Sequence, residues 1–142
     1  MKSIQQINYI KTPPSTIYRA LTTQEGLSEV WTRNLSVKPD LGAINRFDFD
    51  DGYLTEMKVV ELQKDTRVVW ECIQSDKEWV GTEISFDISA ENGVSKVSLS
   101  HDKWSEITDF YRWCNYNWAM FLLSLKSYCE KGKGIPFQER EF

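Results

Sequence analysis

Apolar residues in the first third of the chain predict one strand followed by two short helices. The opening segment, residues 3–12, reads SIQQINYIKT and is strand-like, and Pro14 or Ser15 can begin a helix soon after it. Apolar side chains at i, i+3 and i+4 then mark two helical segments, namely Ile17, Ala20 and Leu21, and Leu27, Val30 and Trp31. We expect the second helix to end near Arg33-Asn34.

From residue 35 to 104 apolar side chains occupy every second position, a spacing that is typical of strands. The clearest strand is predicted for residues 80–89. Its inward face would consist of Val80, Thr82, Ile84, Phe86 and Ile88. Asn92-Gly93 is a strong turn signal and separates this strand from residues 94–104. The region therefore predicts a run of antiparallel strands that includes one hairpin.

One long helix is predicted over residues 107–131, and its apolar side chains form two stripes. The first stripe, expected to face the sheet, consists of Ile107, Tyr111, Cys114, Trp118, Phe121, Leu122, Leu125 and Cys129. The second, which we call the outer stripe, consists of Trp113, Tyr116, Met120 and Leu123. Gly132 and Gly134 end the helix, and the tail that follows, IPFQEREF, is expected to lie over the surface.

This order of elements predicts a single α+β domain over residues 1–142. A curved antiparallel sheet would bury its apolar face against the long C-terminal helix, with the two short helices near the N-terminus. The outer stripe would then need a cover of its own. It is either a contact with another molecule, most simply a symmetric homodimer, or it is covered by the N-terminal helices or a loop.

Composition and charge argue against several partners. The net charge is −4 and no basic stripe follows the chain, so we expect no nucleic acid partner. The N-terminus, MKSIQQINYIK, lacks the apolar region of a secretory signal, and charged residues interrupt the final helix, so we expect a cytoplasmic protein with no membrane contact. The three cysteines, without CxxC spacing, predict buried thiols and not a disulfide framework or a metal site.

Few residues are candidates for catalysis. His101, the single histidine, would share a face with Val97 and Leu99 and could act as a base at a cavity, or it could be a hydrogen-bonded residue at a strand end. Carboxylates on or between strands are a second group, either converging in a cavity or facing solvent: Asp48, Asp50, Asp51, Glu56, Glu61 and Glu71. Glu71, between Trp70 and Cys72, is the most interesting of them. Motifs for phosphate, dinucleotide or metal cofactors are absent from the sequence, so we expect no cofactor.

Aromatic residues are abundant, with six tryptophans in 142 residues. Aromatic walls with a few polar groups are typical of pockets for small apolar ligands, although a core needs the same residues. The candidates for lining such a cavity are Trp31, Trp70, Phe86, Trp118, Phe121 and Leu122, with Trp79 and Trp104 near its rim.

Four stretches give the chain a resemblance to a known family over nearly its whole length. They are PPSTIYRALTTQEGLSEVW, GYLTEMKVVELQKDTRVVWEC, VSKVSLSHDKW and NWAMFLLSLKSYCEKGKGIPF. In order and spacing they resemble the START-like, or SRPBCC helix-grip, superfamily, and within it bacterial proteins related to the C-terminal domain of the activator of Hsp90 ATPase. The resemblance implies a curved sheet around a long C-terminal helix, with an apolar cavity between them.

Three functions are consistent with this resemblance. The first is binding of a hydrophobic or aromatic small molecule in the cavity without transforming it. The second is a cavity-based enzyme of the cyclase, dehydratase or hydrolase type, with His101 or Glu71 transferring protons. The third is a dimeric, stress- or chaperone-linked adaptor that uses the outer stripe. Because one fold can carry all three, the choice depends on the geometry of the site.

Overall fold

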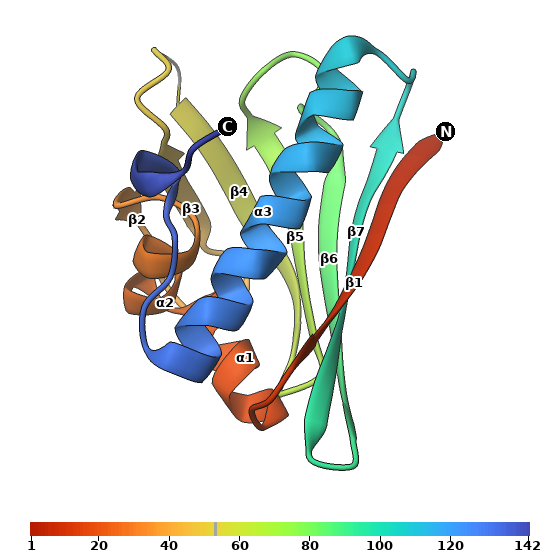
Figure 1. The fold of residues 1–142 in the computed structure, drawn as a ribbon. Helices are drawn as coiled ribbons and strands as arrows, with labels where there is room; N and C mark the ends of the chain where they lie inside the picture. The colour runs from red at the N-terminus through yellow and green to blue at the C-terminus, as the bar shows by residue number, and fades with distance from the viewer. Residues whose placement is uncertain (53) are drawn as a thin grey trace.

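Over the described residues, 1–52 and 54–142, the computed structural model contains one antiparallel sheet with helices against one face (Figure 1). The strands are β1 (Lys2–Ile10), β2 (Asn34–Ser36), β3 (Ile44–Asp48), β4 (Leu54–Gln63), β5 (Arg67–Gln74), β6 (Glu83–Glu91) and β7 (Val94–Trp104), in the spatial order β1-β7-β6-β5-β4-β3-β2. The helices are α1 (Pro14–Thr22), α2 (Gln24–Val30), α3 (Asp109–Lys131) and the 3-10 turn η1 (Phe137–Glu139). The α+β helix-grip prediction is therefore confirmed.

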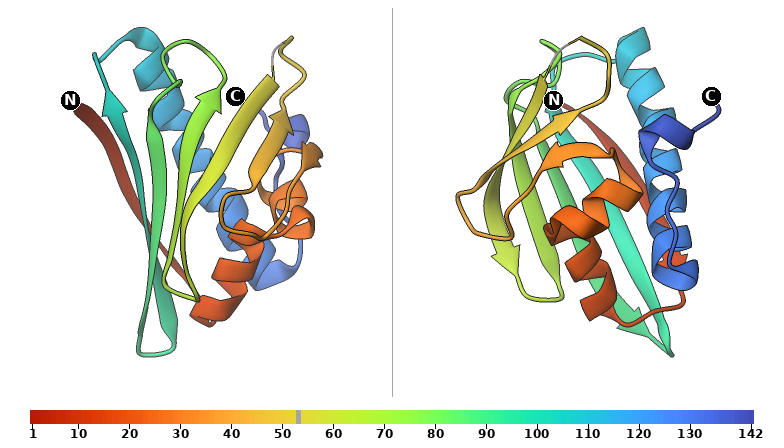
Figure 2. Two further views of the ribbon diagram at one scale, coloured as in Figure 1. Left: turned by 180° about the vertical axis from the view of Figure 1, so that it is seen from behind. Right: turned by 90° about the vertical axis from the view of Figure 1, so that its left-hand side faces the viewer.

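The long helix α3 crosses the face of the sheet, and α1 and α2 lie at one end of the molecule (Figure 2). Helix α3 begins at Asp109, two residues later than predicted, because the hydroxyl of Thr108 caps it by accepting a hydrogen bond from the Tyr111 N–H. It ends at Gly132, whose φ of 79° is the left-handed conformation that glycine adopts without steric cost. The hairpin turn at Asn92-Gly93 is also confirmed, with φ values of 51° and 80°.

Two sequence predictions were wrong at the ends of elements. Val80 is 50% exposed and does not face inward, because Gly81 adopts a φ of 88° in a turn and β6 begins only at Glu83. Ile107 is 48% exposed and precedes helix α3, so it does not belong to the stripe that faces the sheet.

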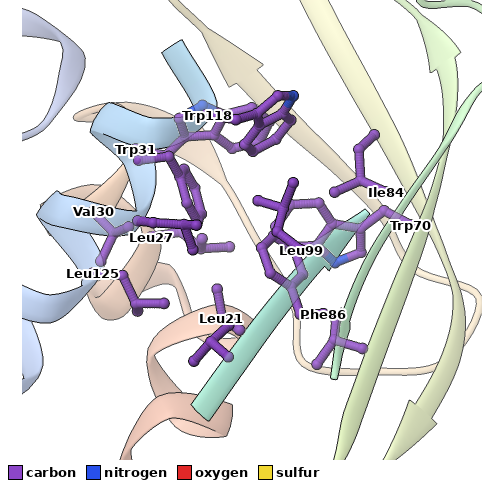
Figure 3. Packing of buried hydrophobic residues seen from close by; sticks show 14 of the residues in the cluster. Leu21, Leu27, Val30, Trp31, Trp70, Ile84, Phe86, Leu99, Trp118 and Leu125 are labelled. Carbon is purple, nitrogen blue, oxygen red and sulfur yellow. The ribbon is translucent and has the colours of Figure 1, made fainter. Parts of the chain in front are cut away.

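Aromatic side chains fill the space between the sheet and α3 (Figure 3). Trp31, at the end of α2, stacks on Trp70 of β5 with ring centroids 5.7 Å apart, and Phe86 of β6 stacks on Phe121 of α3 at 5.6 Å. Trp70, Phe86 and Phe121 are all almost completely buried. The middle of the sheet–helix interface is therefore packed by the protein's own side chains.

His101 is a polar group within this apolar core. It is fully buried, and its Nδ1 accepts a hydrogen bond from the Trp118 indole N–H at 3.0 Å. Its Nε2 lies 2.8 Å from the Thr82 hydroxyl, which itself donates to the Trp79 carbonyl oxygen at 2.6 Å. Because Thr82 has only one hydroxyl proton, Nε2 must be the donor in this pair. His101 is thus a neutral imidazole with both nitrogens hydrogen-bonded.

This arrangement predicts a loss of stability in mild acid. Burial lowers the pKa of His101 from its ordinary 6.5 to about 3, so below pH 6.5 the unfolded chain binds a proton that the folded chain does not. Stability is therefore fully present above pH 6.5 and falls as the pH decreases. We expect the free energy of unfolding to fall by about 2 kcal/mol between pH 7 and pH 5.

Urea denaturation at the two pH values measures this change. A His101→Gln variant is the control, because its unfolding free energy should vary little over the same interval. An NMR titration of the folded protein in which the His101 ring protonates near pH 6.5 would contradict the prediction.

Candidate functional site

A pocket of about 120 Å³ lies beside the first half of α3. Its other walls come from the end of α2, the segment after β3, the facing ends of β4 and β5, the loop between β5 and β6, and the C-terminal tail. The lining residues are Trp31, Phe49, Asp51, Thr55, Ser75, Trp79, Phe110, Trp113, Cys114, Asn117, Trp118, Phe137 and Arg140. The pocket is therefore placed at one end of the sheet–helix interface and not in its packed middle.

The inner wall of the pocket is a group of tryptophan rings. Trp79 and Trp118 stack with centroids 5.9 Å apart and an interplanar angle of 11°, and Trp31 lies 5.6 Å from Trp118. Trp31 and Trp118 also appear beside each other in Figure 3. Phe49 extends this wall toward the tail, with its ring 5.0 Å from Trp31 and 5.6 Å from Phe137. These rings, several of them edge-to-face, make this side of the pocket apolar.

Polar groups at the pocket are few and mostly hydrogen-bonded within the protein. The hydroxyls of Thr55 and Ser75 bond each other at 2.9 Å. The Trp79 indole N–H donates to Cys114 Sγ at 3.3 Å, and burial raises the pKa of the Cys114 thiol to about 12. Cys114 therefore stays a neutral thiol at physiological pH, which is unsuited to a nucleophile.

The C-terminal tail closes one side of the pocket because hydrogen bonds hold it to α2 and α3. The buried Ser124 hydroxyl donates to the Val30 carbonyl oxygen at 2.8 Å and accepts from the Ile135 N–H at 2.7 Å. Two residues further on, the Phe137 N–H donates to the Trp31 carbonyl oxygen at 2.7 Å. These contacts fix the positions of Phe137 and of the residues after it.

Gly134 is required where the tail passes α2. A Cβ atom at this position would collide with the backbone carbonyl of Glu29, and a neighbouring atom, Ser124 Oγ, would lie 3.2 Å away. Glycine therefore allows the close approach of the two backbones that brings the tail to the pocket.

The six predicted lining residues separate into two groups. Trp31 and Trp118 line the pocket, whereas Trp70, Phe86, Phe121 and Leu122 are buried in the core and do not line it. Of the two residues predicted near the rim, Trp79 lines the pocket and Trp104 is almost fully buried. The four core residues are separated from the pocket because the aromatic rings between sheet and helix are already in contact with one another.

Neither of the two catalytic candidates lines the pocket, although His101 lies directly behind the pocket residues Trp79 and Trp118. His101 has both ring nitrogens occupied by Trp118 and Thr82, which favours the structural alternative for this residue. Glu71 is opposite Lys58 on one neighbouring strand and Glu83 on the other, on the face of β5 that points away from α3. Neither residue is among those that line the pocket.

The remaining candidate carboxylates do not converge on one point. Glu56 pairs with Arg46 at 3.3 Å and Glu61 pairs with Arg67 at 3.1 Å, both at the surface. Asp51 is an exposed residue at the pocket mouth. The arrangement therefore offers no pair of buried carboxylates for acid–base catalysis.

The outer stripe remains largely exposed. Trp113, Tyr116 and Leu123 are 49%, 47% and 56% exposed, and Met120 is half-buried. Part of its cover is Phe142 from the C-terminal tail, whose ring lies 5.4 Å from that of Trp113. Trp113 also lines the pocket, so the outer stripe and the pocket are adjacent.

Sequence reasoning missed the pocket residues that follow β3 or lie in the C-terminal tail, above all Phe49, Phe137 and Arg140. The available signal was the apolar pair Ile135 and Phe137 in a tail that we expected only to lie over the surface. The hydrogen bonds that hold this tail to α2 could not be inferred from the spacing of apolar residues in the sequence.

Three further properties bear on the chemistry of the described residues. Cys72, Cys114 and Cys129 are free thiols. Across 1–52 and 54–142, no three His, Cys, Asp or Glu side chains are grouped so that they could hold a metal ion. A search of the same residues finds no helix with the length and apolar character needed to cross a membrane.

Solved structures share this fold. The chain is similar to the Aha1 protein of Colwellia psychrerythraea, described as a dimer in solution, with 39% identity, a TM-score of 0.87, and coverage of 94% of this chain and 100% of that one. The DynU16 protein of the dynemicin biosynthetic locus aligns with a TM-score of 0.78 at 18% identity, over 94% of this chain and 49% of that one. Protein MLL2253 of Mesorhizobium loti aligns with a TM-score of 0.77 at 17% identity, over 89% and 95%.

No protein with a curated description matches the chain. A family model does match, over residues 11–130, which include both N-terminal helices, the sheet from β2 to β7 and nearly all of α3. By this match, and by the 39% identity to the Colwellia protein over the whole fold, the chain belongs to the family described as activator of Hsp90 ATPase homolog 1-like proteins.

Proposed function

We propose that this protein reversibly binds a small aromatic or other apolar molecule in the pocket beside α3, without transforming it. The observation that carries the proposal is the pocket of about 120 Å³ itself, whose inner wall includes the three tryptophans Trp31, Trp79 and Trp118. Proteins with the helix-grip fold commonly bind hydrophobic ligands, and this supports the same use here.

The size of the pocket limits the ligand. Its volume of about 120 Å³ is close to the roughly 150 Å³ of an apolar cavity known to take up benzene. It is well below the roughly 300 Å³ at which sites for drug-sized molecules begin. A single ring, or the end of a longer molecule that extends out of the mouth, therefore fits best.

The binding energy from such a ring is modest. Burying roughly 150 Å² of apolar surface at about 25 cal/mol per Å² contributes about 4 kcal/mol before the cost of association, so the Kd is no tighter than about 1 mM. A neutral ligand is therefore expected to bind weakly, and tighter binding requires a polar group in addition.

We expect indole and p-cresol to bind the pocket. In a ¹H–¹⁵N NMR titration, the indole N–H signals of Trp79 and Trp118 should shift with a common Kd of about 1 mM. Replacing Asn117, on the pocket side of α3, by Phe should fill the mouth and weaken binding at least tenfold.

The matched control is Ala119→Phe, which adds the same ring at an exposed position of α3 outside the pocket. Its affinity should equal that of the unmodified protein. The proposal fails if neither neutral nor charged aromatic compounds shift any pocket signal up to their solubility limits.

A second function is supported by the outer stripe. Trp113, Tyr116 and Leu123 form exposed apolar surface on α3, and such surface on a small protein usually marks a contact with a partner. The Colwellia relative is a dimer, which supports a homodimer as the partner for this chain too. A dimer contact here would also cover the side of the pocket that Trp113 forms.

Leu123→Glu should shift this dimer toward the monomer. A charge placed in an apolar contact must lose its hydration without a partner, so we expect the dimer Kd to increase at least tenfold. Sedimentation equilibrium over a range of protein concentrations measures it. The control is Ile44→Glu, at a 52% exposed position on β3, which should leave the dimer Kd unchanged. A protein that stays monomeric at millimolar concentration would rule out this second function.

A further inference from the structure

Arg140 is a cation in a pocket whose lining is mainly aromatic. It comes from the C-terminal tail, beyond η1, and lines the same space as Trp31, Phe49 and Phe137. Its Nε donates to the Ile135 carbonyl oxygen at 3.0 Å and its Nη2 donates to the Val30 carbonyl oxygen at 2.9 Å. The guanidinium is therefore held in a fixed orientation at the pocket wall.

These two bonds leave three N–H donors of the guanidinium available to a ligand. The group has five N–H donors, of which the two backbone carbonyls use one each. Within the described part of the chain, none of the other three N–H groups has an acceptor at hydrogen-bond distance, and no buried nitrogen of Arg140 is unsatisfied. The free donors therefore reach accessible space.

Arg140 also lacks a carboxylate partner. Arg46, Arg67 and Arg112 form ion pairs with acidic residues at the surface, whereas no carboxylate of residues 1–52 or 54–142 lies within 4.0 Å of Arg140. Burial lowers the pKa of Arg140 to about 10, and the group remains charged at neutral pH. A cation that has lost much of its hydration without gaining a counter-charge attracts an incoming anion more strongly than a solvated cation does.

The nearest acidic segment does not neutralise this site. Asp51 lines the pocket but is exposed at its mouth, where water and salt screen its charge. Asp50 accepts hydrogen bonds from Asn34 at 3.0 Å and Gln138 at 3.3 Å, so its carboxylate bonds to these residues and not to Arg140. The half-buried guanidinium of Arg140 therefore has the larger influence on a ligand inside the pocket.

We propose that the ligand is a small aromatic carboxylate, whose ring lies against Trp31, Phe49 and Phe137 and whose carboxylate accepts hydrogen bonds from Arg140. This inference rests on the proposed function and adds the chemical class of the ligand. A hydrogen bond to a charged group contributes about 1.5–3 kcal/mol, so the anion should bind roughly ten- to a hundredfold more tightly than its neutral analogue.

The experiment compares two pairs of near-isosteric compounds on the full chain at pH 7. Benzoate is compared with benzamide, and indole-3-carboxylate with indole-3-carboxamide, by the NMR titration of the tryptophan indole signals. We expect each carboxylate to bind at least tenfold more tightly than its amide, and the difference to shrink as salt is raised from about 20 mM to 500 mM.

Three variants assign the effect to the guanidinium. Arg140→Met should remove the difference between carboxylate and amide, and Arg140→Lys should retain part of it, since Lys keeps the charge but not the two-pronged geometry. Asp51→Asn should tighten carboxylate binding slightly. The matched control, Glu141→Gln, removes an exposed charge at the next position in the sequence. It should reduce neither the affinity for the carboxylate nor the affinity for the amide.

The outcomes separate the two proposals. If amides and carboxylates bind equally well to the unmodified protein, the inference about Arg140 is wrong and the proposed function stands. If no compound of either kind binds, both fail. Because this comparison uses the unmodified protein, it remains decisive even if loss of Arg140 detaches the tail.

Discussion

The shape of the pocket depends on one buried hydroxyl. Ser124, on α3, donates to the Val30 carbonyl oxygen at the end of α2 and accepts from the Ile135 N–H in the tail. The same Val30 carbonyl also accepts from Arg140. Three segments that are far apart in sequence therefore meet at one junction, and the residues just beyond it form the pocket walls. Because an unpaired buried hydroxyl costs about 1–3 kcal/mol, separating the tail and α2 from Ser124 is unfavourable.

A second constraint acts on the interior. The concave face of the sheet and α3 could enclose a cavity along their whole length, but Trp70, Phe86 and Phe121 occupy its middle. What remains open is the end, where Trp79 and Trp118 stack and the chain passes from strands into loops. The fold thus combines a well-packed core with a small open pocket, and the boundary between them runs through the indole of Trp118, which contacts both His101 and the pocket.

Much of the fold could be predicted from the sequence because the period of apolar residues changes clearly at residue 35 and again near residue 107. The hairpin at Asn92-Gly93 and the helix end at Gly132 follow from local chemistry. The candidate site could be predicted only in part. Alternation identifies Phe86 as inward-facing, but whether an inward ring meets a cavity or another ring depends on residues far away in sequence. No sequence pattern placed Arg140 at the pocket, since its position depends on the hydrogen bonds between the tail and α2.

The tail has a further consequence for how this fold can vary. The family match ends at residue 130, whereas the wall formed by Phe137 and Arg140 comes after it. The core residues are supplied almost entirely by the segment before that boundary. The tail therefore completes the pocket wall without adding a residue to the buried core cluster, although most of the other lining residues come from before the boundary. If the pocket binds a ligand as proposed, a change of a few residues after Gly134 would alter its preference without repacking a single residue of the core cluster.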